Sequence, residues 1–130
     1  MAKTVLVIED EDALQDAIKR KLGATGNTVV SAMTAESGLK QLEELTPDLI
    51  WLDLLLPGMG GFQFLQHLRK EDRWKNIPVM VVSVSASPEK IQQAFQLNVV
   101  DYVVKSQYRL EDIVKKVTDL LDKKGVATHI

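Results

Sequence analysis

A single aspartate, Asp53, stands inside an apolar stretch that reads LIWLDLLLPGMGG from Leu49 to Gly61. It is the only charged residue between Leu49 and Pro57, and an uncompensated carboxylate is costly to bury. The apolar residues around it, ended by the Pro57-Gly58 pair, predict a strand buried on both faces, as in a parallel sheet. Asp53 would then lie near the carboxyl end of that strand, where open α/β sheets bind ligands. We therefore interpret Asp53 as the chemical centre of the protein.

Polar side chains also follow three other predicted strands: Glu9, Asp10, Ser83 and Lys105. The carboxyl ends of parallel strands meet at one edge of a sheet, so we expect these side chains to converge on Asp53. Three clustered carboxylates repel one another and favour a hard cation, and a few carboxylates completed by water suit Mg²⁺. A lysine and a hydroxyl beside them would neutralise and hydrogen-bond a phosphoryl group. An aspartate can accept that group as an acyl phosphate.

The elements that must position these residues alternate along the chain. Short apolar runs predict strands at residues 4–8, 28–32, from 49 onward, 79–82 and 101–104. Apolar residues at helical spacing follow each of these runs, most clearly between Leu110 and Leu121. Five strand–helix pairs in strict alternation predict a single α/β domain with a parallel sheet that is covered by helices on both faces.

Several residues predict where the helices begin and end. Asp12 with Gln15 three residues later has the spacing of a capping box. Thr34 and Ser87 are predicted N-caps, and Ser87 is followed by a proline at the first helical position. Asn98 tolerates the left-handed conformation that commonly ends a helix.

Composition narrows the class of protein. The 130 residues fit one domain, and 45% hydrophobic with 26% charged residues is typical of a soluble globular protein. A net charge of −2 gives no electrostatic footprint for nucleic acid or an anionic membrane. The absence of cysteine excludes disulfides and thiolate metal sites. The first residues show no signal-peptide pattern, so we expect a cytoplasmic protein. Residues 1–122 form the predicted domain, and residues 123–130 a loose C-terminal tail.

Together these residues resemble the receiver domains of two-component response regulators, of the CheY type. The resemblance covers the chain from about Thr4 to Leu121. It rests on motifs in order along the chain, namely Glu9-Asp10, Asp53-x-x-x-Pro57-x-Met59-x-Gly61, Ser83 and Tyr102-x-x-Lys105. The resemblance implies a doubly wound (βα)5 flavodoxin-like fold with a five-stranded parallel sheet in the order 2-1-3-4-5.

The resemblance also implies a role for each site residue. Asp53 would accept the phosphoryl group, and Lys105 would bind the phosphoryl oxygens. Mg²⁺ would be held by Asp53, by Asp10 directly, by Glu9 through water, and by the backbone carbonyl of Leu55. Ser83 would hydrogen-bond the phosphoryl group, and Tyr102 would follow it as the aromatic half of a switch.

Partners follow from the same resemblance. A sensor histidine kinase or a phosphotransfer protein would supply the phosphoryl group from a phosphohistidine. An output protein would read the change on the surface formed by helix four, strand five and helix five. Because no DNA-binding module follows the last helix, we expect a stand-alone receiver without direct nucleic-acid or membrane contact. We expect a monomer or a phosphorylation-dependent homodimer. Trp74 lies in a polar connection, where we expect a surface or partner contact.

The chain departs from the usual receiver pattern near the site. Val84 follows the switch hydroxyl, where the family usually has a small residue, and we expect it to narrow access to Asp53 and slow phosphorylation. Ser106 replaces the proline that usually follows the lysine. A cis bond before serine costs roughly 2.5–4 kcal/mol, so we expect a trans bond. Leu55 and Ser85 offer no acid or amide to orient water, so we expect a long-lived phosphorylated form.

Two other functions stay open on the sequence. A pseudo-receiver would use the same surface as a scaffold without phosphorylation, and Val84 and the missing proline are compatible with it. An aspartate-nucleophile phosphatase usually carries a second aspartate two residues beyond the nucleophile, where this chain has Leu55, so we do not expect a conventional enzyme. Taken singly, the run Glu9–Asp12 also fits a solvated turn, Ser83 a strand-end hydroxyl, and Tyr102 a half-buried strand aromatic.

Overall fold

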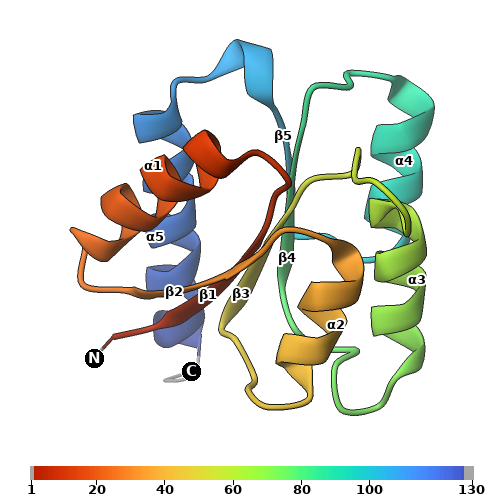
Figure 1. Cartoon of the computed structure of the whole chain (residues 1–130), viewed down its shortest axis with the longest axis horizontal. Helices are drawn as coiled ribbons and strands as arrows, with labels where there is room; N and C mark the ends of the chain where they lie inside the picture. Colours follow the sequence, from red (N-terminus) through yellow and green to blue (C-terminus); the bar gives the residue numbers. More distant parts are fainter. Residues whose placement is uncertain (1, 128–130) are drawn as a thin grey trace.

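Strands and helices alternate along the whole of the described chain (Figure 1). The computed structural model describes residues 2–127, with side chains up to Lys123. The strands are β1 (Thr4–Ile8), β2 (Thr28–Ala32), β3 (Leu49–Leu52), β4 (Val79–Ser83) and β5 (Asp101–Val104). The helices are α1 (Asp12–Gly23), α2 (Ala35–Leu42), α3 (Gly61–Lys70), α4 (Pro88–Gln96), the short 3₁₀ helix η1 (Lys105–Gln107) and α5 (Leu110–Ala127).

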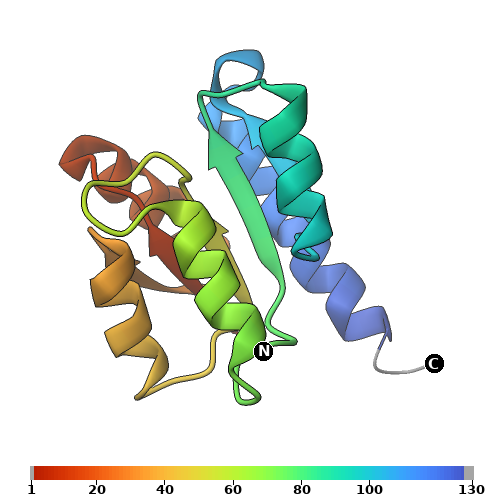
Figure 2. The same ribbon diagram turned by 90° about the vertical axis from the view of Figure 1, so that its right-hand side faces the viewer.

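The five strands form one parallel sheet in the order β2-β1-β3-β4-β5, which confirms the predicted topology. Helices α1 and α5 cover one face of the sheet, and α2, α3 and α4 cover the other (Figures 1 and 2). With right-handed crossovers, α1 covers one face because the chain moves from β1 outward to β2, and α2, α3 and α4 cover the other face because it then moves in the opposite direction through β3 and β4 to β5. The chain thus has the doubly wound fold that the sequence predicts.

The central strands are buried on both faces, and this explains their almost wholly apolar composition. In β1, Val5 and Val7 point into the core under α1 and α5, whereas Leu6 and Ile8 point into the core under α2, α3 and α4. Every residue of β3 is buried. The two hydrophobic cores pack against both faces of β3 and therefore hold its end, just before Asp53, in a fixed position.

Predicted helix ends are largely confirmed. The hydroxyl of Thr34 accepts a hydrogen bond from the Ser37 N–H at 3.0 Å, and Ser87 caps α4, with proline at the first turn. Asn98 adopts the left-handed conformation, with φ 62°, where α4 gives way to β5. The capping-box prediction for α1 is wrong. The N-cap is Glu11, its side chain makes no cap hydrogen bond, and Gln15 is buried elsewhere.

Two further expectations need correction or restatement. Trp74 is not a surface contact, since it is only 4% exposed and belongs to the core under α2 and α3. The Arg73 guanidinium and the His67 ring lie against its indole. Helix α5 continues past the predicted end of the domain at residue 122 to Ala127. Residues 128–130 of the predicted tail lie outside the described residues, so the domain boundary stays a prediction. Across the described residues, no helix is long and apolar enough to cross a membrane.

Candidate functional site

Asp53 lies directly after β3, at the carboxyl edge of the sheet, and its side chain is 7% exposed. Its main-chain N–H donates to the carbonyl of Ile8, which ties the residue to the end of β1. The Leu55 N–H donates to Oδ1 of Asp53 at 3.0 Å. The carboxylate is therefore held by its own backbone loop and presents Oδ2 toward Lys105.

Lys105 brings the two ends of the sequence together at this carboxylate. It begins the 3₁₀ helix after β5, and its Nζ donates to Oε2 of Glu9 at 2.9 Å and to Oδ2 of Asp53 at 3.3 Å. The Lys105 side chain is 17% exposed and the Glu9 side chain is fully buried. An ammonium group held between two carboxylates is a charge-assisted arrangement that orients all three side chains. The predicted convergence of Glu9, Asp53 and Lys105 is confirmed.

The surroundings of Glu9 raise the pKa of its carboxyl group. Burial raises the pKa of this carboxyl group, the hydrogen bond from Lys105 lowers it, and the nearby charge of Asp53 raises it again, with a net pKa of about 7. Burial lowers the pKa of Lys105, but the hydrogen bond to Glu9 and the charges of Asp53 and Glu9 outweigh it, so the net direction is upward. Glu9 is therefore only partly ionised near neutral pH.

The carboxylates of Glu9, Asp10 and Asp53 form the acidic cluster of the site. One oxygen from each lies within 4.8 Å of the others. Asp10 is exposed, whereas Glu9 and Asp53 are buried. The Oε1 atom of Glu9 is buried and has no hydrogen-bond partner among the described residues. Carboxylate oxygens with one solvent-facing member fit the ligand preference of Mg²⁺, which keeps part of its water shell.

Ser83 starts a chain of hydroxyl–amide hydrogen bonds that leads away from the site. It is fully buried, and its Oγ accepts the Ser85 N–H at 3.3 Å. The Ser85 Oγ accepts the Ser87 N–H at 3.3 Å, and the Ser87 Oγ accepts the Lys90 N–H in the first turn of α4 at 3.5 Å. The Tyr102 hydroxyl donates to the Ser85 carbonyl at 2.9 Å. The sequence predicted only the Ser87 cap among these contacts. Together they connect the edge of the site to the start of α4.

The loop after Asp53 is held close to the sheet. An ideal Cβ on Gly61 would lie 2.6 Å from the Leu54 Cα and 2.9 Å from the Asp53 carbonyl oxygen, so only glycine fits there. Gly58 adopts φ +70°, which side chains rarely adopt, and Oε2 of Glu36 accepts the N–H of the residue after it. The glycines of the motif therefore shape the loop that presents Asp53.

Two apolar side chains stand exposed beside the site. Leu55 is 48% exposed and Val84 is 59% exposed. The exposure of Val84 does not test its effect on access to Asp53, which stays a prediction. The Lys105–Ser106 bond is trans, as expected, since no peptide bond within the described range is cis.

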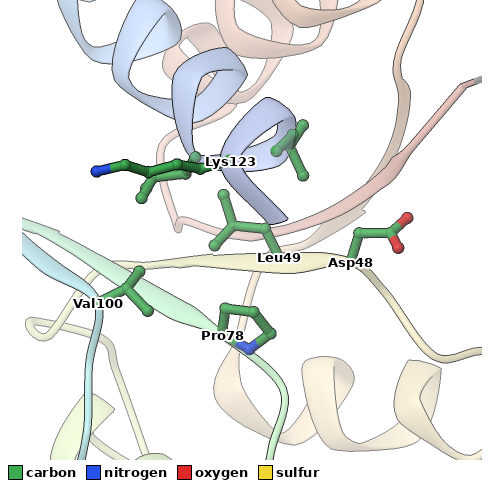
Figure 3. A pocket seen from close by; sticks show the side chains of 7 residues that line it. Asp48, Leu49, Pro78, Val100 and Lys123 are labelled. Carbon is green, nitrogen blue, oxygen red and sulfur yellow. The ribbon is translucent and has the colours of Figure 1, made fainter. Parts of the chain in front are cut away.

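A separate hollow of about 270 Å³ lies at the other end of the strands (Figure 3). Leu49 at the start of β3, Pro78 before β4 and Val100 before β5 form its walls, together with Leu120 and Leu121 of α5. Its position at the amino-terminal edge separates it from the carboxylates and the lysine, which all follow strand ends. It takes no part in the site described above.

Comparison with known proteins places these features in context. Residues 5–118 match the family model of the response regulator receiver domain. The phosphate regulon transcriptional regulatory protein PhoB of Escherichia coli is 35% identical over 105 residues, which cover 81% of this chain and 46% of PhoB. The chain thus spans about half the length of the curated relatives it matches.

Solved structures agree with the fold. The CheY-like response regulator receiver domain protein of Methanospirillum hungatei matches with a TM-score of 0.87 and 26% identity, over 98% of this chain and 99% of that one. The phosphorylated cyanobacterial phytochrome response regulator RcpA matches with a TM-score of 0.82 and 28% identity, over 93% and 94% of the two chains.

Proposed function

Because this chain belongs to the family of response regulator receiver domains of two-component signalling, we propose that it is a switch that is turned on by phosphorylation of Asp53. The observation that carries the proposal is the position of Lys105, whose Nζ bridges the carboxylates of Glu9 and Asp53 beside the exposed Asp10. Members of this family act as signalling proteins rather than as conventional enzymes. The similar regulator RcpA is described in a phosphorylated form, which supports the assignment.

The proposed reaction is a phosphoryl transfer from a phosphohistidine. A carboxylate oxygen of Asp53 attacks phosphorus, a P–O bond forms, the P–N bond breaks, and the imidazole leaves with the electron pair of that bond. The product is an acyl phosphate on Asp53. Lys105 donates hydrogen bonds to the phosphoryl oxygens after its contact with the Asp53 carboxylate is replaced. A sensor histidine kinase or a phosphotransfer protein is the proposed donor.

Glu9, Asp10 and Asp53 are the residues that would hold Mg²⁺, with the Leu55 carbonyl as a further proposed ligand. Bound Mg²⁺ supplies positive charge that neutralises the oxygens of the transferred group. The residues present fit the ion, because Oε1 of Glu9 is a buried oxygen with no hydrogen-bond donor among the described residues, and because three ionised carboxylates would carry more charge than the one lysine. The Leu55 N–H and the Lys105 ammonium hold the Asp53 carboxylate in place for this role.

The proposed output runs from Ser83 to the surface formed by α4, β5 and α5. When the Ser83 hydroxyl turns to the phosphoryl group, it releases the Ser85 N–H, which it accepts at 3.3 Å in this structure. The Ser85 carbonyl also accepts the hydrogen bond from the Tyr102 hydroxyl, and the Ser85 hydroxyl accepts one from the N–H of Ser87, which caps α4. A change at Ser83 therefore reaches both Tyr102 and the first turn of α4 through bonded neighbours.

The remaining assignments are parts of the same proposal. The receiver domain comprises residues 1–122, it works in the cytoplasm, and it acts as a monomer or as a homodimer that forms on phosphorylation. The phosphorylated form is long-lived, because Leu55 and Ser85 give no acid or amide that could orient an attacking water. Output passes to another protein or domain, without direct contact between the receiver and nucleic acid.

The test of the proposed function is the mass of the intact protein after incubation with acetyl phosphate and Mg²⁺. We expect one phosphoryl adduct, which is lost in Asp53→Asn and in the presence of a chelator. The alternative function, a pseudo-receiver that works as a scaffold, is compatible with Val84 after the switch hydroxyl and with Ser106 in place of the usual proline. It predicts no adduct under conditions that label another receiver domain.

A further inference from the structure

Gln15 is the one buried amide side chain in α1, and all of its donated hydrogen bonds go to the main chain at the edge of the site. The residue is 4% exposed. Its Nε2 donates to the carbonyls of Val7 at 2.9 Å, Glu9 at 3.0 Å and Ala32 at 3.0 Å. Its two N–H bonds serve three acceptors, so at least one of them is shared. Because all three neighbours are acceptors, the amide nitrogen must face them, and Oε1 has no partner among the described residues.

These carbonyls lie where the pairing of two strands ends. β1 and β2 pair up to Ile8 and Ala32, and the Glu9 N–H then donates to the Ala32 carbonyl at 3.1 Å. Beyond this point β2 offers no further N–H group to β1, so the Glu9 carbonyl lacks a strand partner. The amide of Gln15 takes that place and continues the hydrogen bonding past the end of the sheet.

The main chain of Glu9 is therefore held on both sides. Its N–H is bound by Ala32 and its carbonyl by Gln15, and the next residue is Asp10. Two of the three clustered carboxylates, those of Glu9 and Asp10, thus belong to a segment whose main chain Gln15 holds in place. The amide does this without adding a charge, which leaves the excess negative charge of the cluster available to a cation.

We propose that Gln15 is the positioning residue of the Mg²⁺ site, setting the backbone of Glu9 and Asp10 so that their carboxylates meet Asp53. This inference rests on the proposed function, which supplies the ion. Groups that orient metal ligands typically change metal affinity by roughly 10–100-fold when they are mutated, although they do not touch the ion. Gln15 has this relationship to Glu9, whose carbonyl it binds.

The experiment measures Mg²⁺ affinity by calorimetric titration in wild type, Gln15→Met and Leu22→Ala. Methionine keeps the length of the side chain but leaves the carbonyls of Val7, Glu9 and Ala32 without this donor. Leu22 is fully buried in the core under α1 and α5, at the opposite end of α1 from Gln15, so its substitution by alanine controls for lost stability. We expect roughly 10–100-fold weaker binding in Gln15→Met and less than about twofold change in Leu22→Ala.

A second readout does not depend on the metal. In metal-free protein, the amide resonances of Glu9 and Asp10 should shift in Gln15→Met and stay in place in Leu22→Ala. If Gln15→Met does not fold, Gln15→Asn keeps the amide on a shorter stem, and we expect an intermediate loss of Mg²⁺ affinity. Unchanged affinity in both Gln15 variants, or equal losses in Gln15→Met and Leu22→Ala, would overturn the inference. Absence of Mg²⁺ binding to wild type would instead contradict the proposed function and remove the basis of the inference.

Discussion

The Nζ atom of Lys105 lies 2.9 Å from Oε2 of Glu9, although the two residues are 96 positions apart in the chain. The same Nζ is 3.3 Å from Oδ2 of Asp53. The lysine therefore compensates two buried carboxylates that would otherwise repel each other, and it does so from the short helix that follows the last strand of the sheet. In the proposed function the carboxylates bind the cation and Lys105 binds the phosphoryl group, so the two roles can be tested one at a time.

Lys105→Met should separate these roles. Without the ammonium group, the phosphoryl oxygens lose a charged donor, and we expect the rate of adduct formation with acetyl phosphate to fall by about 10²–10³. Mg²⁺ affinity should not fall, because the substitution removes a positive charge that lies against two of the three proposed ligands. Stopped reactions analysed by intact mass give the rate, and calorimetry gives the affinity. Parallel losses of rate and affinity would contradict this division of roles.

Mg²⁺ binding should depend on pH through Glu9. Its pKa is raised from 4.5 to about 7, mainly by burial, so at pH 6 the folded protein holds a proton that Mg²⁺ must displace. We expect affinity to weaken as pH falls below about 7, by at most roughly tenfold per pH unit. Titration at pH 6 and pH 8 measures this, and Glu9→Gln should flatten the dependence. An affinity that is equal at both values in wild type would argue against a protonated Glu9.

The same shift has a sign for the stability of the metal-free protein. A carboxyl group with a raised pKa contributes stability below its ordinary value of 4.5, and this contribution is lost as pH rises through about 7. Added Mg²⁺ should restore stability at pH 8 more than at pH 6. Thermal unfolding with and without Mg²⁺ at the two pH values checks this. The quantity to compare is the rise in melting temperature that Mg²⁺ causes at each pH.

The lifetime of the phosphorylated form should depend on Leu55. Its side chain is 48% exposed, so a polar residue can replace it without loss of core packing, while its N–H stays bonded to Asp53. We expect Leu55→Glu to shorten the lifetime by roughly tenfold, less than a fully positioned general base contributes, because the new carboxylate can orient water. Loss of the adduct over time after removal of acetyl phosphate is the measurement, and Leu55→Met is the control. A lifetime that is equally short in wild type would refute the predicted persistence.

Two adjacent glycines give a matched test of the loop that holds Asp53. A Cβ at Gly61 would meet the Leu54 Cα at 2.6 Å, whereas a Cβ at Gly60 would meet nothing within 4 Å. Gly61→Ala should therefore lower the free energy of unfolding by about 1–3 kcal/mol, as overpacking against backbone does. Gly60→Ala should change it by less than about 1 kcal/mol. Urea unfolding of both variants checks the difference, and equal effects would show that the loop relaxes freely.

Much of the fold and of the site could be predicted from the sequence, because both follow from short-range patterns. Alternation of strands and helices determines the parallel sheet, and the rule that strand ends share one edge was enough to bring Glu9, Asp53 and Lys105 together. The N-caps Thr34 and Ser87 were found for the same reason, since a cap depends on residues within one turn.

What the sequence missed depends on contacts between distant segments. Gln15 has the spacing of a capping-box residue, but its true partners are carbonyls on β1 and β2, and only the point where β2 ends makes them available. Trp74 has polar neighbours in the sequence, yet the packing of α2 against α3 buries it. The serine contacts that follow Ser83 depend on the path of one loop, which no periodicity encodes.

The central claim is tested most directly by locating the phosphoryl group on the chain. After treatment with acetyl phosphate and Mg²⁺, borohydride reduces an acyl phosphate to an alcohol, which converts the modified aspartate to homoserine. Peptide sequencing by mass spectrometry then distinguishes the buried Asp53 from the exposed Asp10 of the same cluster. We predict homoserine at position 53 alone, and none in the Asp53→Asn variant. Homoserine at position 10, or at neither position, would contradict the account.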